Sequence, residues 1–162
     1  MPTRKSLDHL DCSVANTVDL IGDRWTVLIL RDAFLGVRRF DDFQSDLGIA
    51  RNVLADRLQL LVDSGVMKTR QYEEHPPRHE YLLTEKGRDL FDVLIVLWKW
   101  GDRWAPPPGV ELRRLHHLEC DTDTYATLTC GNCGGLLDNR NIRIEPPLPI
   151  VADRRAKVST AG

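Results

Sequence analysis

The amino-acid sequence predicts a mainly α-helical fold with one small β-wing. Apolar residues recur at helical spacing through 40–64, with a glycine in the middle where a tight turn is needed. Strand-like runs follow at 66–83, and a long apolar stripe at helical spacing covers 85–104. Two short helices around a glycine turn, followed at once by a hairpin and a further helix, predict a winged helix-turn-helix.

Two helices are expected before this motif. Residues 1–11 are expected to form a flexible N-terminus, and a first helix is predicted over 13–21 with Ser13 as its N-cap. Asp23 is placed to cap a second helix over 24–35, which is apolar nearly all round and therefore predicts a core helix. The connector 36–39 is a candidate strand that adds to the sheet of the wing.

The helix-turn-helix is predicted as a first helix over 40–47, a turn at Gly48, and a second helix over 50–64. Leucines line one side of the second helix, and Arg51, Asn52 and Arg57 lie off that apolar stripe. Such side chains suit phosphates and base edges, so the second helix is a candidate for insertion into a DNA major groove.

The wing is predicted as strands over 66–72 and 79–83 joined by a loop at 73–78. Its tip would reach toward the DNA backbone or the adjacent minor groove. Thr84 is then expected to cap one long helix over 85–104, whose broad apolar stripe exceeds what a small domain can cover. The terminal helices are therefore expected to form a homodimer, and the alternative is a core helix packed within one copy.

Composition agrees with a globular protein of one domain and an appendage. The 162 residues carry a net charge of −2, and neither a signal peptide nor an apolar run long enough to cross a bilayer is present. A cytoplasmic location and no contact with membranes are therefore expected. The negative net charge of the whole chain argues against binding to nucleic acid, but arginines gather on the side proposed to face DNA. Modest, salt-sensitive affinity for double-stranded DNA is expected.

A Pro-rich linker at 105–110 separates the winged helix of 12–104 from a small Cys/His module at 111–145, and a flexible tail is expected at 146–162. The module holds two ligand pairs at knuckle-like spacing: His117 with Cys120, and Cys130 with Cys133. Four such nitrogen and sulfur ligands predict a structural Zn²⁺ in a zinc ribbon. His116 competes with its neighbour for the histidine position, and the alternatives are a metal-free turn or a site that has lost its ion.

With these elements placed, the chain resembles the HxlR family of winged helix-turn-helix transcription regulators, relatives of the MarR type. The resemblance covers most of 12–104, and Arg24 stands where the family usually has lysine. The matching stretches are Cys12, GDRW at 22–25, LILR at 28–31, RF at 39–40, GI at 48–49, Leu54, RL at 57–58, GV at 65–66, PR at 77–78, EY at 80–81, LTEKG at 83–87 and WG at 100–101. It implies a dimeric regulator that binds a pseudo-palindromic operator and responds to an oxidant or a small molecule.

Carried over by position, the resemblance places Arg51 and Asn52 in the first turn of the recognition helix, where we expect base contacts. Arg39 and Arg57 are expected to hold phosphates. The full set of candidate DNA-binding residues is Arg38, Arg39, Arg51, Asn52, Ala55, Arg57, Arg78 and His79.

The resemblance also implies a redox role for Cys12, because oxidant-sensing members of the family carry a cysteine in this region. Cys12 comes just before the expected N-cap of the first helix, and a helix N-terminus favours a thiolate. The alternative is an unreactive, half-buried cysteine.

Parts of the sequence are also compatible with two other functions. A thiol oxidoreductase using Cys130 and Cys133 would need a helix after the first cysteine, but Gly134 and Gly135 follow the pair. A winged helix that binds protein instead of DNA would suit the acidic balance. Within the sequence no Ser/His/Asp set, paired carboxylates or phosphate-binding loop stands out, so no enzymatic activity is expected.

Overall fold

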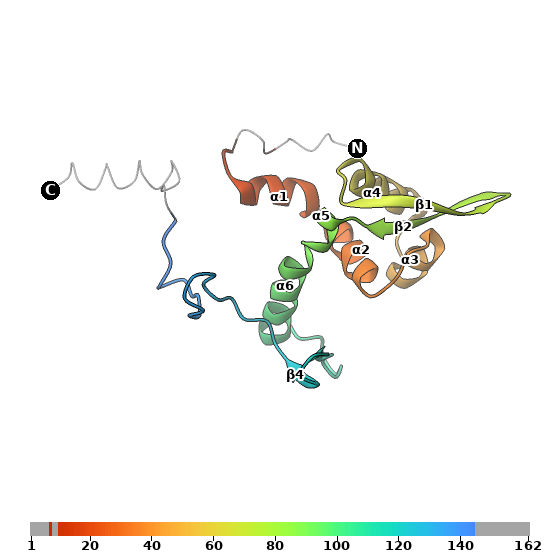
Figure 1. Cartoon of the computed structure of the whole chain (residues 1–162). Coiled ribbons are helices and arrows are strands. Elements are labelled where there is room, and N and C mark those ends of the chain that lie inside the picture. Colours follow the sequence, from red (N-terminus) through yellow and green to blue (C-terminus); the bar gives the residue numbers. More distant parts are fainter. Residues whose placement is uncertain (1–6, 8–9, 145–162) are drawn as a thin grey trace. The chain divides into compact units, whose positions relative to one another are not determined.

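The computed structural model describes Leu7 and residues 10–144, so the predicted N-terminal segment lies mostly, and the predicted tail entirely, outside the described residues. The chain divides into an N-terminal unit that ends at Leu112 and a C-terminal unit that begins at Arg113. The N-terminal unit is mostly helical with a two-stranded wing (Figure 1). The N-terminal unit is therefore a winged helix-turn-helix, as predicted.

Helix α1 (Ser13–Ile21) leads into α2 (Arg24–Phe34), whose N-cap Asp23 accepts a hydrogen bond from the Trp25 amide at 3.0 Å. The cap predicted for α1 is wrong by one residue. Cys12 is the N-cap, Ser13 is already helical, and Cys12 makes no side-chain capping bond. Ser13 instead accepts the hydroxyl of Thr17 on its carbonyl oxygen at 2.8 Å, so its backbone is part of the first helical turn.

The helix-turn-helix is formed by α3 (Phe40–Leu47) and α4 (Arg51–Asp63). Gly48 joins them in the left-handed region at φ 59°, and its amide donates to the Gln44 carbonyl at 3.0 Å. Ile49 follows into the core. The fully buried residues come from α2, α3, α4 and the residue before β1; they include Ile29, Leu30, Phe43, Leu54, Leu58, Leu61 and Val66.

The wing pairs β1 (Met67–Glu74) with β2 (Pro77–Leu83) in antiparallel register, with an irregularity between Gln71 and Glu73. The strands run further than the sequence predicted, so the loop at 73–78 shrinks to a turn at 75–76. Pairing of Glu73 with Arg78 continues the ladder there, and polar residues of this kind give no strand signal in the sequence. The connector at 36–39 does not form the strand considered for it: the sheet has two strands, and the connector meets it at one isolated bridge, between Arg39 and Glu80.

The single helix predicted over 85–104 is wrong. A short α5 (Glu85–Arg88) is followed by a turn and then by α6 (Phe91–Trp104). Thr84 caps α5 as expected, accepting from the Gly87 amide at 3.2 Å, and its hydroxyl donates to the Gly65 carbonyl at 2.6 Å. These contacts fix α5 against the end of α4, while Leu90 packs against the core, and the helix is interrupted by a turn at 89–90.

In the C-terminal unit, β3 (Leu115–His117) pairs with β4 (Thr122–Thr124), and a bridge joins Thr129 to Leu136. No residue from 113 to 144 is buried. Among the described residues, no helix of either unit is both long enough and apolar enough to cross a membrane.

Candidate nucleic-acid interface

Helix α4 presents opposite faces to the core and to solvent. Leu54, Leu58 and Leu61 are fully buried, whereas Arg51, Asn52 and Ala55 are exposed. By the helical period Asn52 falls on the side away from the buried leucines and Ala55 on their flank, while Arg51, three residues before Leu54, is exposed at the first position of the helix. The first turn of α4 therefore offers a guanidinium and an amide, the groups that form paired hydrogen bonds with guanine and adenine.

Arg51 is oriented by the neighbouring helix α3. Its Nη1 lies 3.3 Å from Asp41 Oδ1 and 3.3 Å from Gln44 Oε1, and its guanidinium lies over the Phe40 ring at 4.6 Å from the centroid. The side chain remains 69% exposed. The guanidinium keeps donors for a further partner, since these contacts use only one of its nitrogens.

Arg57 has different surroundings from the other predicted DNA contacts. Its Nε lies 3.4 Å from Asp23 Oδ1, and both side chains are 27% exposed. Because Asp23 is also the N-cap of α2, this ion pair ties the middle of α4 to the start of α2. The placement gives Arg57 a structural contact, and its predicted contact with a phosphate stays a prediction.

At the base of the wing, positive charges surround Glu80. Arg70 Nη2 lies 2.6 Å from Glu80 Oε2, and Arg39 Nε lies 3.9 Å from Oε1. The hydrogen bond from Arg70, with Arg38 and Arg39 nearby, lowers the pKa of Glu80. Arg39 also stacks on Tyr72 at 4.5 Å. Glu80 thus stays ionised at neutral pH and offsets part of the local positive charge.

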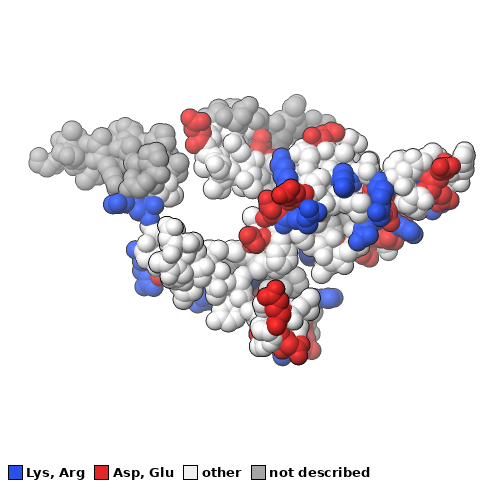
Figure 2. Space-filling view, viewed as in Figure 1, with Lys and Arg blue, Asp and Glu red and all other residues white. Residues whose placement is uncertain are grey.

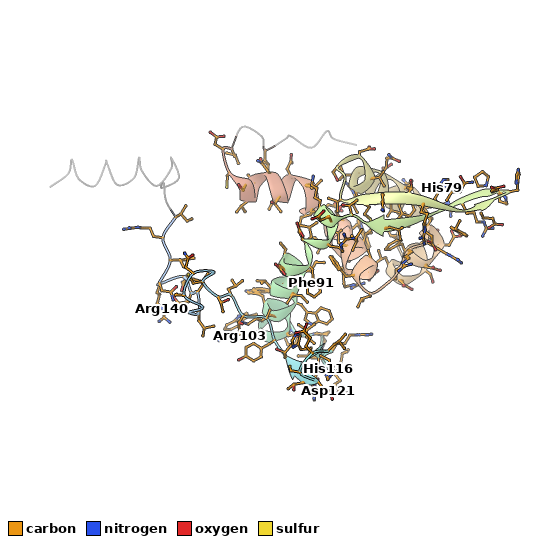
Figure 3. All side chains as sticks on the ribbon, viewed as in Figure 1. His79, Phe91, Arg103, His116, Asp121 and Arg140 are labelled. Carbon is orange, nitrogen blue, oxygen red and sulfur yellow. The ribbon has the colours of Figure 1, made fainter. Side chains whose placement is uncertain are left out.

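At the tip of the wing, Arg78 pairs with Glu73 at 3.3 Å. A hydrogen bond with the Tyr72 side chain and the nearby Glu73 carboxylate raise the pKa of Arg78, so it stays charged. His79 is exposed on β2 (Figure 3). Both wing residues predicted to contact DNA are therefore on the surface.

A polar cleft of about 430 Å³ brings several predicted residues together between α3, the first turn of α4 and the wing. Arg39, Arg51, Arg78 and His79 line it, together with Asp41. Arg38, Asn52, Ala55 and Arg57 are not part of its lining. Lys and Arg side chains lie among Asp and Glu on the N-terminal unit, as the space-filling view shows (Figure 2). The local field is therefore mixed, which favours salt-sensitive binding.

Sequence reasoning missed the partners that orient these arginines. Asp41, Gln44, Tyr72 and Glu80 are the residues in question, and each contacts an arginine from another element. The contacts depend on how α3 packs beside α4 and on the register of the wing, which no local sequence pattern specifies. The acidic residues alone were visible in the sequence, as nearby negative charge.

The predicted metal ligands form two separate pairs. His117 Nδ1 lies 3.1 Å from Cys120 Sγ. Backbone amides of Cys133 and Asn132, and then the Cys133 side chain, lower the pKa of the Cys130 thiol. Within the described residues, no three Cys, His, Asp or Glu side chains come together in an arrangement that could hold a metal. Each pair has suitable donor chemistry for Zn²⁺, and the four-ligand site stays a prediction.

His116, the alternative histidine ligand, is engaged elsewhere. Its Nε2 lies 3.0 Å from Asp121 Oδ1, and its Nδ1 lies 3.2 Å from Asp123 Oδ1. These contacts, Asp123 first, raise the pKa of His116. Of the two histidines, His117 is the one beside a cysteine, as predicted. Cys12 is a half-buried free thiol at the N-cap of α1.

Comparison with known proteins identifies the N-terminal unit. The family model described as HxlR-like helix-turn-helix matches residues 20–108. The HTH-type transcriptional regulator Rv3095 of Mycobacterium tuberculosis, itself uncharacterised, is 45% identical over 134 residues, covering 83% of this chain and 85% of the relative. The regulator sll1512 of Synechocystis is 38% identical over 105 residues, or 64% and 78% of the two chains. The 134 residues matched in Rv3095 exceed the 112 of the N-terminal unit, so that match extends into the C-terminal unit.

Solved structures agree with the sequence relatives. The crystal structure of PA1607, a candidate transcription factor, matches with a TM-score of 0.75 at 38% identity, covering 85% of this chain and 96% of that one. The redox regulator HypR in its reduced form matches with a TM-score of 0.54 at 30% identity, covering 57% and 92%. By family model, relatives and fold, the chain belongs to the HxlR-like helix-turn-helix family and is a winged-helix DNA-binding transcriptional regulator.

Proposed function

We propose that the chain binds a pseudo-palindromic operator as a homodimer, inserting α4 of each copy into the major groove. The observation that carries this proposal is the exposed first turn of α4 beside the arginine-lined cleft of the wing. Arg51 and Asn52 would contact base edges, and Arg39 and Arg78 would contact phosphates. The proposal includes no enzymatic activity.

The homodimer is proposed from the exposed apolar surface of α6 and α1. No residue of α6 is buried in one copy. Leu90 and Leu94 pack toward the core, while an outer stripe stays exposed; its members are Val93, Leu97, Trp100 and Trp104. Their spacing of three or four residues makes a continuous helical face. Val14 and Val18 add exposed apolar area on α1. Surface of this kind is typical of an interface between copies.

The operator proposal is tested by selecting fragments of the host genome that the full chain binds, followed by footprinting. We expect two half-sites related by two-fold symmetry, with centres about 10 base pairs apart or a multiple of that. Affinity should fall steeply between low and physiological salt. A footprint over one unpaired half-site would contradict the homodimer. Binding that ignores both sequence and salt would favour the protein-binding alternative.

A structural Zn²⁺ held by His117, Cys120, Cys130 and Cys133 is proposed for the C-terminal unit. The donor set supports it, and so does the absence of any buried residue from 113 to 144, because a unit without a core needs another source of folding energy. Elemental analysis of the purified chain should find one zinc per copy. Chelation should then remove the ordered signals of the C-terminal unit and leave those of the winged helix. Metal-free protein with an ordered C-terminal unit would contradict the proposal.

An oxidant-responsive role for Cys12 is also proposed. It is supported by the thiol's position at the N-terminus of α1 and by the likeness to HypR, which is described as a redox regulator. Titrating operator binding with an oxidant, in the wild type and in Cys12→Ser, tests the role. The wild type should lose affinity at lower oxidant concentration than the variant. Identical curves would contradict it.

A further inference from the structure

A second cleft of the N-terminal unit lies beside the interface described above and shares with it Tyr81 and the candidate DNA-binding residue Arg38. It measures about 660 Å³ and lies between the end of α2, the β1–β2 sheet and the α5–α6 turn; we refer to it as the α2–α6 cleft. Its apolar lining includes Phe34, Val37 and Phe91, and its charged lining consists of Arg38, Lys68, Arg70 and Arg88. Helix and wing therefore contribute to one concave surface.

The apolar part of the α2–α6 cleft is built around two aromatic rings. The rings of Phe34 at the end of α2 and Phe91 at the start of α6 lie 5.4 Å apart between centroids, with an angle of 55° between their planes. Phe91 is labelled in Figure 3. Phe91 remains 48% exposed, and Phe34 and Val37 are half-buried. Within one copy, these side chains therefore keep apolar area that a flat apolar group could cover.

The charged part is held in place by the sheet. In the register of the wing, Lys68 pairs with Leu82 and Arg70 pairs with Glu80, so Lys68 and Arg70 project from the same face of β1. The backbone of Arg38 is fixed by the hydrogen bond from the Tyr81 amide to its carbonyl oxygen, at 2.8 Å. The wing and the connector before α3 thus both contribute positive charge to the lining of the cleft.

The positive charge of this cleft is only partly compensated. Arg70 forms an ion pair with Glu80 at 2.6 Å, and the Arg88 guanidinium donates to the Leu83 carbonyl at 3.3 Å. Among the described residues, the side chains of Arg38 and Lys68 form no ion pair, and no Asp or Glu lines the cleft. An anion placed there would therefore gain charge-assisted hydrogen bonds without first displacing a carboxylate from those two side chains.

We propose that the α2–α6 cleft binds a small organic anion: a carboxylate carried on a flat, apolar body such as an aromatic ring. Lys68 and Arg38 take the carboxylate, and Phe34 and Phe91 cover the body. The positive charges favour this anion over a neutral apolar compound. The apolar area left on the two rings favours it over inorganic phosphate. The proposal concerns binding to the winged-helix unit itself and does not depend on the operator.

Calorimetric titration of the full chain with 1-naphthoate tests this proposal. We expect one site per copy, at least roughly tenfold weaker binding of the neutral 1-naphthalenemethanol, and weaker binding of inorganic phosphate. Equal affinity for the neutral alcohol, tighter binding of phosphate, or no binding of naphthoate at millimolar concentration would each overturn the proposal. Naphthoate affinity that falls as protein concentration rises would also overturn it, because a second copy would then be the natural occupant. No DNA is present, so the result is independent of the operator proposal.

A matched pair of variants assigns the site. Lys68→Gln removes a charge from the cleft, and Arg113→Gln removes one from the C-terminal unit, with the same change in net charge. We expect Lys68→Gln to weaken naphthoate binding by roughly tenfold or more and Arg113→Gln to leave it unchanged. Lys68→Arg should retain binding. Circular dichroism and thermal unfolding establish that each variant is folded. Equal affinities for the Gln variants would overturn the assignment.

Discussion

Arg51 illustrates how one side chain can be oriented before its ligand arrives. The ring of Phe40 supports the guanidinium, and Asp41 and Gln44 each contact it at 3.3 Å. A side chain already held in one arrangement loses less conformational entropy when it binds. The same Asp41 carboxylate also sets a negative charge beside the proposed DNA surface. Orientation and repulsion therefore come from the same residue.

Replacing Arg51 with alanine should reduce operator affinity by roughly 1–3 kcal/mol and relax the preference at one base position, because a paired hydrogen bond to a base edge is lost. Fluorescence anisotropy on the selected operator and on its single-base variants measures both effects. Arg113→Ala is the matched control, since Arg113 belongs to the C-terminal unit. If affinity instead drops equally on every sequence, Arg51 contacts a phosphate.

Asp41→Asn should raise affinity for arbitrary DNA more than affinity for the operator. The variant removes a negative charge near the phosphates and also frees the Arg51 guanidinium to move. Asp46→Asn, on an exposed residue of the same helix, controls for the change in net charge. The ratio of the two affinities, measured at one salt concentration, decides the matter. An unchanged ratio in Asp41→Asn would show that Asp41 does not orient Arg51.

The sequence predicted which residues of α4 are exposed better than it predicted what each one contacts. The leucine spacing gave the buried side, and the structure confirms Arg51 and Asn52 on the exposed one. Arg57 lies at an intermediate position of the same helix, and its ion pair with Asp23 depends on the crossing of α4 and α2. Periodicity within one helix contains no information about that crossing.

At the scale of elements, the α5 helix is defined by a close backbone approach. A Cβ built on Gly87 would lie 2.2 Å from the Val66 carbonyl oxygen, a distance that backbone atoms cannot tolerate. Gly87 is buried, and Thr84 binds the same stretch through its hydroxyl. The junction of wing, α5 and the end of α4 therefore depends on a residue without a side chain.

Gly87→Ala should destabilise the winged-helix unit by more than about 2 kcal/mol, since either β1 or α5 must move away from the other. Gly131→Ala is the control, because nothing lies within 4 Å of a Cβ built there. Urea unfolding followed by far-ultraviolet circular dichroism measures both variants. Similar unfolding midpoints for the two variants would mean that the backbone at this junction can move apart without loss of stability.

The break between α5 and α6 is the largest error of the predicted fold, and its cause is tertiary. The stretch 85–104 has helical residues and helical spacing throughout, so local patterns favour a single helix. The packing of Gly87 on Val66 and the burial of Leu90 toward the core decide otherwise. The turn glycine, the recognition helix and the presence of the two wing strands, though not the strands' full length, were predicted correctly because their signals are local.

At the scale of the whole molecule, assembly depends on the outer stripe of α6. Trp100→Glu should weaken the proposed homodimer by at least about 2 kcal/mol, because a large aromatic anchor is replaced by a charge. Light scattering after size exclusion, across a dilution series, measures the mass. Val110→Glu provides the control, with an equally exposed apolar residue outside the helices (61% for both). A wild-type chain that stays monomeric at all concentrations would contradict the homodimer.

The sequence could not establish whether the C-terminal pairs combine into one site. The sequence spacing predicted that His117 lies near Cys120 and Cys130 near Cys133, because the members of each pair are only three residues apart. The meeting of the two pairs depends on the path of the residues between them, which carry few apolar side chains to direct it. Local spacing predicts pairs, and only a folded chain or a bound ion can join them.

The missing burial along α6 has a consequence for regulation in the cell. None of the fourteen residues of this helix is buried in one copy, so a neighbour that covered it would add to its stability. If that neighbour is a second copy, as proposed, the concentration of dimers competent to bind an operator rises with the square of the chain's abundance at low expression. Dilution by cell growth would then weaken repression or activation without any inducer, and modest changes in synthesis rate would be amplified into larger changes at the promoter.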